Sequence, residues 1–190
     1  TGVTSHGATL LKTAHIRYAG RGKTFIGRVD GRITEDLKQI QRVFNEAKIE
    51  TEISKDINNL IWNKLIVNVG INALTAITRL KNGELLNYQG TKDIMSGAVK
   101  EAIQVARAVN VKLSYKDSMS KVEAVCRATK DNISSMLQDV LRGKKTEIDF
   151  INGAIVKLGK KYQIPTTIND FLTKLVKVIE SSFNLQVGGL

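Results

Sequence analysis

Three polar residues stand four positions apart in an apolar stretch, because Lys64, Asn68 and Asn72 all lie within residues 59–74. Residues at this spacing share one face of a helix, so the pattern predicts a polar stripe on an otherwise buried helix. Unpaired buried polar groups cost about 1–3 kcal/mol each, so the stripe requires a partner element, ordered water or a polar ligand. A lysine desolvated in such a helix can donate a proton near neutral pH. The alternative is a lysine that reaches solvent from the edge of the helix.

A second polar cluster begins at Asn132 and Ser134, either of which can cap the helix that follows. Further along, Thr146 and Asp149 have the positions to form a capping box. These structural roles leave Glu147 unexplained, because its carboxylate stands at the start of a long predicted helix. We therefore treat Glu147 as a candidate for chemistry beside the lysine.

Other chemical motifs are weak in this sequence. Two histidines, far apart, are too few for a metal site, and Cys126 lies in a helical pattern typical of a packing residue. The Gly20-x-Gly22 pair with Gly27 has the wrong spacing for a dinucleotide-binding fingerprint. We interpret it as a hairpin turn and predict no metal.

Composition limits the possible partners. The net charge of +11 suggests nucleic acid, but the basic residues are dispersed and only 5% of residues are aromatic, so we predict no nucleic-acid binding. No apolar run approaches the roughly 20 residues of a membrane span, so we also predict no membrane association. The single cysteine cannot form an internal disulfide, which favours a reducing compartment and a cytoplasmic protein.

The first part of the chain is predicted to contain strands. Residues 14–19 and 23–29 have strand patterns and are expected to be joined by the glycine turn at 20–22. Residues 49–53 form a short strand or an extended link. Because so few strands would be marginal alone and the chain opens on Thr1, we expect residues 1–54 to be the tail of a larger domain.

From residue 55 onward the pattern is helical, and a single proline in the whole chain suits long helices. The helix with the polar stripe is expected to break or bend around Gly70, and Gly143 is expected to terminate a later helix. The remaining helices are predicted at residues 35–47 (capped by Thr34), 91–109, 116–129, 134–142, 147–162 and 167–183. This predicts a mainly α chain, with an all-helical domain at 55–190 after a β-containing remnant at 1–54.

Taken together, these residues resemble ketopantoate reductase (2-dehydropantoate 2-reductase) over the later portion of that family. Five motifs in the same order carry the resemblance, and together they are quite specific. They are Ser5-His6-Gly7-Ala8 with Gly20-x-Gly22-x-Thr24-x-Ile26-Gly27; Trp62-x-Lys64-Leu65-x-x-Asn68-x-x-x-Asn72-x-Leu74-Thr75; Asn82-Gly83; Asn132-x-x-Ser135-Met136-x-Gln138-Asp139; and Thr146-Glu147-Ile148-Asp149-x-Ile151-Asn152-Gly153.

The resemblance implies a reductase that passes hydride from NADPH to ketopantoate, giving pantoate for coenzyme A synthesis. It implies that Lys64 is the proton donor to the carbonyl oxygen, and that Glu147 is a second catalytic residue near cofactor and substrate. It also implies that Ala8 contacts the cofactor through its backbone. The substrate-binding positions that it implies are Asn68, Asn72, Asn82, Asn132 and Ser135.

The resemblance also implies a Rossmann-type dinucleotide-binding domain, of which residues 1–54 would be the remnant. The family's glycine-rich fingerprint is missing from this sequence, so we expect an incomplete and inactive fragment whose NADPH would be bound mainly by the absent part. A homodimer is a possible assembly. Two rivals stay open, which are a reductase of another small 2-oxo acid and a non-catalytic helical binding domain.

Overall fold

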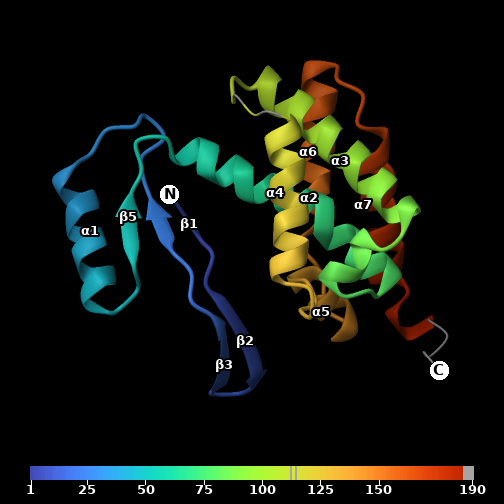
Figure 1. The fold of residues 1–190 in the computed structure, drawn as a ribbon, viewed down its shortest axis with the longest axis horizontal. Coiled ribbons are helices and arrows are strands. Elements are labelled where there is room, and N and C mark those ends of the chain that lie inside the picture. The colour runs from blue at the N-terminus through green and yellow to red at the C-terminus, as the bar shows by residue number, and fades with distance from the viewer. Residues whose placement is uncertain (112, 114, 186–190) are drawn as a thin grey trace. The chain divides into compact units, whose positions relative to one another are not determined.

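A computed structural model describes residues 1–111, 113 and 115–185 (Figure 1). The chain divides into two compact units, Thr1–Lys64 and Leu65–Leu190. The first unit contains all the strands among the described residues, and the second is built from helices. This distribution confirms the predicted mainly α class with strands confined to the start of the chain.

The first unit contains a three-stranded sheet in the order β1 (Gly2–Thr4), β4 (Thr24–Ile26), β5 (Thr51–Ile53). β1 is antiparallel to β4, whereas β5 is parallel to β4. The crossover between the parallel strands contains helix α1 (Glu35–Glu46), so β4, α1 and β5 form a βαβ unit. Dinucleotide-binding sheets are assembled from units of this kind.

The hairpin of the first unit differs from the predicted one. It is formed by β2 (Gly7–Lys12) and β3 (His15–Gly20), whereas β4 pairs with β1 and β5. The strands predicted at 14–19, 23–29 and 49–53 are therefore present, but the expected hairpin turn at 20–22 is wrong. A Cβ at Gly22 would overlap the backbone of Ser5. The glycine permits two chain segments to approach closely, which local sequence does not reveal.

Helix α1 begins as predicted, because the Thr34 hydroxyl accepts a hydrogen bond from the Leu37 backbone N–H at 3.4 Å. Leu37 is its buried residue, while Ile40 and Val43 are 46% and 56% exposed. The apolar face of α1 is thus only partly covered by the first unit.

Helix α2 (Ile57–Thr78) begins in the first unit and continues into the second. The helix does not break at Gly70, so an interruption there is wrong, whereas a bend stays a prediction. A Cβ at Gly70 would lie 2.9 Å from Val122 Cγ1 and 3.2 Å from Val99 Cγ2, so the glycine permits close helix packing. By length and composition alone α2 could cross a membrane, so the expectation that no apolar stretch approaches a membrane span is wrong. Half of its most apolar window is buried, as in the core helix of a globular protein.

The other described elements of the second unit are helical, and α3 and α4 pack against the later part of α2 at Gly70 (Figure 1). Gly143 follows the Arg142 C-cap with φ +60°, which confirms the predicted helix-terminating glycine. The helix predicted at 147–162 is instead a short 3₁₀ turn followed by α6. The elements are η1 (Asn82–Leu86), α3 (Gln89–Ala108), α4 (Tyr115–Ala128), α5 (Ser135–Leu141), η2 (Ile148–Phe150), α6 (Asn152–Tyr162), α7 (Thr167–Ser181) and η3 (Phe183–Leu185).

Candidate active site

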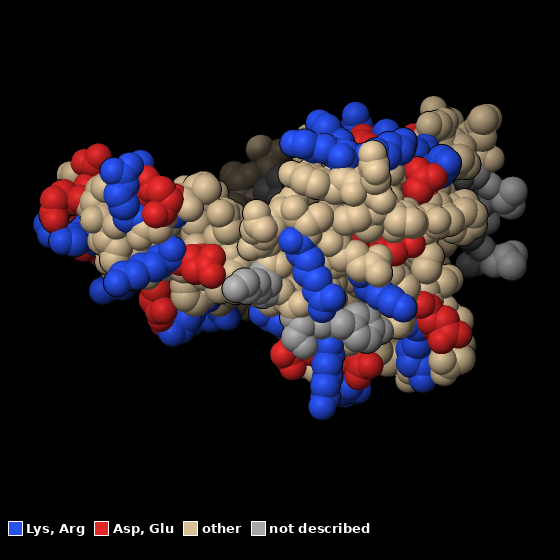
Figure 2. All heavy atoms as spheres, turned by 90° about the horizontal axis from the view of Figure 1, so that it is seen from above, with Lys and Arg blue, Asp and Glu red and all other residues tan. Residues whose placement is uncertain are grey.

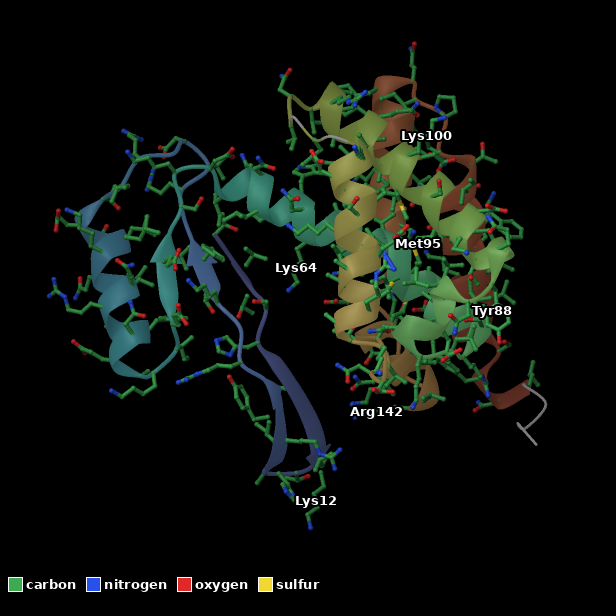
Figure 3. The ribbon with its side chains drawn as sticks, viewed as in Figure 1. Lys12, Lys64, Tyr88, Met95, Lys100 and Arg142 are labelled. Atoms are coloured by element: carbon green, nitrogen blue, oxygen red, sulfur yellow. The ribbon has the colours of Figure 1, made fainter. Side chains whose placement is uncertain are left out.

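Lys64 lies on α2 as the last residue of the first unit, and its side chain projects from the helix (Figure 3). The ammonium is exposed, and Nζ donates a hydrogen bond to the Thr4 carbonyl at 2.8 Å. Among residues 57–64 only Ile57 is buried. Of the two alternatives, the structure has the lysine that reaches solvent and not the desolvated one.

The two asparagines of the stripe are progressively more buried than the lysine. Asn68 is half-buried and Asn72 is 6% exposed. Since the helix is continuous, the four-residue spacing keeps all three side chains near one face of α2. The face therefore runs from a solvent-accessible ammonium to an enclosed carboxamide.

The later part of α2 is joined to the start of α5 by two buried hydroxyl groups. Thr75 Oγ1 and Ser134 Oγ are 2.6 Å apart, and Ser134 Oγ also accepts from the Leu137 backbone N–H at 3.1 Å. Ser134 is thus the cap of α5, which resolves the choice between Ser134 and Asn132. Ser135 is the first residue of α5 and is exposed.

Asn82 and Asn132 are brought together by a backbone hydrogen bond of 3.0 Å from the Asn82 N–H to the Asn132 carbonyl. The Asn82 side chain is buried and donates from Nδ2 to Thr129 Oγ1 at 2.9 Å. Its Oδ1 is buried with no hydrogen-bond partner among the described residues. Asn132 is exposed. The pair therefore connects η1 to the loop before α5.

Glu147 is exposed and directly precedes η2. The predicted capping box beside it is wrong, because Thr146 Oγ1 accepts from the Ile148 N–H at 3.1 Å and the Thr146 N–H donates to Glu180 Oε1 at 2.6 Å. These bonds fix the backbone on both sides of Glu147 and leave its carboxylate on the surface.

Ala8 is exposed on β2. Ala8 and Lys64 belong to the first unit, and the other predicted site residues belong to the second. No group of three or more metal-ligating side chains occurs among the described residues. Sequence reasoning assigned no role to Asn152, although that residue belongs to the last motif. In the structure it joins a network with Asn169 and Glu101.

The comparisons with known proteins define the class of this helical unit. Residues 56–180 match the family described as ketopantoate reductase PanE/ApbA C terminal. The 2-dehydropantoate 2-reductase of Archaeoglobus fulgidus is 40% identical over 181 residues, which are 95% of this chain and 60% of that protein. The chain belongs to the ketopantoate reductase family, as the motifs suggested.

Solved structures agree with this assignment. The PanE/ApbA family ketopantoate reductase from Ralstonia eutropha JMP134 superposes with a TM-score of 0.88 at 33% identity, covering 96% of this chain and 59% of that one. The ternary structure of D-mandelate dehydrogenase with NADH and anilino(oxo)acetate gives 0.89 at 28% identity, with coverages of 96% and 60%. The chain thus spans about 60% of the length of the relatives it matches.

Proposed function

We propose that this chain is the substrate-binding portion of an NADPH-dependent reductase that converts 2-dehydropantoate to pantoate. The observation that carries the proposal is the face of α2 with Lys64, Asn68 and Asn72, in a chain 40% identical to a 2-dehydropantoate 2-reductase. We further propose that residues 1–54 belong to a dinucleotide-binding domain and 55–190 to the helical domain. The βαβ unit formed by β4, α1 and β5 supports the first assignment.

Lys64 is assigned the proton transfer. A bound nicotinamide would supply hydride to the carbonyl carbon of the substrate, and the carbonyl oxygen would then carry the developing negative charge. An ammonium beside that oxygen stabilises the charge and delivers the proton that completes the hydroxyl group. Its exposure lets Lys64 meet a ligand, and its hydrogen bond to the Thr4 carbonyl gives the ammonium a defined direction.

The remaining site residues are assigned to binding. Carboxamides at Asn68 and Asn72 suit a small polar acid, because each offers both donors and an acceptor. Asn82, Asn132 and the exposed Ser135 hydroxyl extend this polar set, and the unpartnered Asn82 Oδ1 is an acceptor. The proposal includes Glu147, whose carboxylate is exposed, as a second catalytic residue.

The fit of these residues to NADPH is partial. Ala8 is exposed on β2 and Glu147 is exposed before η2, so both can meet a cofactor. The described strand-to-helix connection between β4 and α1 has no glycine-rich fingerprint, so most cofactor contacts must come from other residues. These residues would therefore hold only the reactive end of the cofactor.

A reductase of another small 2-oxo acid is the second candidate, and the likeness to D-mandelate dehydrogenase favours it. A non-catalytic binding domain is less favoured, because the basic residues are dispersed along the sequence, and acidic side chains lie among the basic ones on the face drawn in Figure 2. Cytoplasmic location, a homodimer and the lack of nucleic-acid or membrane partners stay predictions.

The proposal is tested by Lys64→Ala in the full-length protein. We expect turnover with ketopantoate to fall at least about 100-fold, because a positioned general acid contributes roughly 10²–10⁴. The free energy of unfolding should change by no more than about 0.5 kcal/mol, because the lysine is on the surface. Lys100→Ala on α3, another exposed lysine shown in Figure 3, is the control and should keep normal turnover. Near-normal turnover of Lys64→Ala would contradict the assignment.

A further inference from the structure

A buried chain of side-chain amides connects four helices of the second unit. Asn152, at the start of α6, donates from Nδ2 to the Val69 carbonyl in α2 at 3.3 Å and to Asn169 Oδ1 in α7 at 3.0 Å. Asn169 donates from Nδ2 to the Ala98 carbonyl in α3 at 3.0 Å and to Glu101 Oε2 at 2.7 Å. Both asparagines are completely buried. We call Glu101, Asn169 and Asn152 the amide relay.

Glu101 anchors one end of the relay. Its carboxylate accepts from the backbone N–H groups of Ile168 at 2.9 Å and Asn169 at 3.0 Å, in the first turn of α7. The N-cap residue of α7, Thr166, makes no side-chain capping bond, so a carboxylate from α3 satisfies these donors instead. Three hydrogen bonds hold Glu101 and Asn169 in one arrangement.

This anchor determines the orientation of both amides. The two hydrogens of Asn169 Nδ2 are taken by acceptors, Glu101 and Ala98, so a flipped amide would turn its oxygen against two other oxygens. With Asn169 fixed, its Oδ1 can only accept, and Asn152 must present its nitrogen. The second hydrogen of that nitrogen is then directed at the Val69 carbonyl.

The relay ends between the two asparagines of the proposed site. Val69 follows Asn68 and lies three residues before Asn72, on a helix that Gly70 lets approach α3 and α4 closely. Asn152 is also five residues after Glu147, at the end of the short segment that carries it. One side chain thus connects the helix with Asn68 and Asn72 to the segment with Glu147.

The amide nitrogen of Asn152 is the group that this position requires. An apolar residue would remove the buried Oδ1, which has no hydrogen-bond partner among the described residues, but it would leave Asn169 Oδ1 and the Val69 carbonyl without this donor. The amide that links α7 to α2 is therefore the feature that distinguishes asparagine here.

We propose that Asn152 is a positioning residue that fixes α2 at Val69 against the segment carrying Glu147, with its amide oriented through Asn169 by Glu101. The catalytic consequence of this inference rests on the proposed function. The attachment of α2 to the segment carrying Glu147 does not. A shift of about 1 Å in catalytic groups can cost about 100-fold in rate, so a partial loosening should cost about tenfold.

The test uses three variants of the full-length protein: Asn152→Ala, Asn169→Leu and the control Ile155→Val. Asn169 is linked to α2 through Asn152 by these hydrogen bonds, whereas Ile155 is a buried residue of α6 outside the relay. Amide hydrogen exchange is measured for residues 69–76 of α2. In a helix the Ala73 backbone N–H donates to the same Val69 carbonyl that Asn152 contacts, so this range reports on that contact. Steady-state kinetics with ketopantoate and NADPH are measured in parallel. Denaturant is added so that the variants are compared at the same free energy of unfolding.

Both relay variants should exchange faster than the control across 69–76 at matched stability. Their kcat/KM should fall about tenfold because kcat falls while KM stays the same. The kcat/KM of Ile155→Val should stay within about twofold of normal. Exchange across 69–76 equal to the control would overturn the relay, and unchanged kcat with faster exchange would overturn its catalytic role. If the wild-type protein reduced no 2-oxo acid, the proposed function would fail, and the exchange result would still decide whether the relay holds α2.

Discussion

Replacing Gly70 by alanine tests how closely the helices of the second unit pack around α2. The new methyl group would lie 2.9 Å from Val122 Cγ1, 3.2 Å from Val99 Cγ2 and 3.4 Å from Met95 Cγ. All three neighbours are completely buried, and Met95 lies inside the group of helices in Figure 3, so none can turn into solvent. The methyl must therefore displace a helix or force a strained side chain.

Two opposing effects set the size of the change. Alanine favours a helix interior over glycine by about 1 kcal/mol. Overpacking a well-filled core costs about 1–3 kcal/mol, and contacts at 2.9 Å place this position in the upper part of that range. We expect Gly70→Ala to lower the free energy of unfolding by about 1–2 kcal/mol.

Urea unfolding followed by circular dichroism measures this difference. Gly90→Ala in α3 is the matched control, because a Cβ there meets nothing within 4 Å, and it should be neutral or stabilising by up to about 1 kcal/mol. Val122→Ala should relieve the clash, giving a favourable coupling of about 0.5–3 kcal/mol in the double variant. Stabilisation by Gly70→Ala alone would refute the packing argument.

Two further predictions concern single side chains. Burial, with a smaller contribution from Glu123, raises the pKa of the Cys126 thiol to about 11, so a thiol reagent at pH 8 should label the unfolded protein and spare the folded one. The pKa of an unfolded thiol is near 9.0, so the stability that this neutral thiol contributes should be complete below pH 9. That contribution should be lost as the pH rises from about 9 to about 11, and urea unfolding at a series of pH values measures the loss. Glu147→Ala should reduce kcat/KM at least about tenfold and leave the free energy of unfolding within about 0.5 kcal/mol, since Glu147 is exposed. Unchanged activity and ligand affinity in this variant would contradict the catalytic assignment and leave Glu147 with a local structural role.

Most helices of the second unit could be predicted from the sequence, because the signals are local. Apolar periodicity predicted the helix at 91–109, which the structure has at Gln89–Ala108, and Gly143 ends α5 as expected. Capping by Thr34 was equally clear, since one hydroxyl bonds to a backbone group three residues away. Such features depend on a few consecutive residues.

Features that depend on distant residues escaped the sequence. The role of Gly22 is set by Ser5, and the partners of β4 come from both sides of it in the chain. The burial of α2 was overestimated because composition shows how apolar a helix is, not how much of it is covered. For the candidate site, motif order indicated the residue set, but the relay from Glu101 to Asn152 has no local pattern.

The reductase proposal is tested most directly by the rate of NADPH consumption by the full-length protein with ketopantoate, measured beside pyruvate and 2-oxoisovalerate. We expect rapid consumption with ketopantoate and little with the other two acids. Preference for another acid would keep a reductase but contradict the assigned substrate. No consumption with any of the three would contradict the proposed reductase function itself.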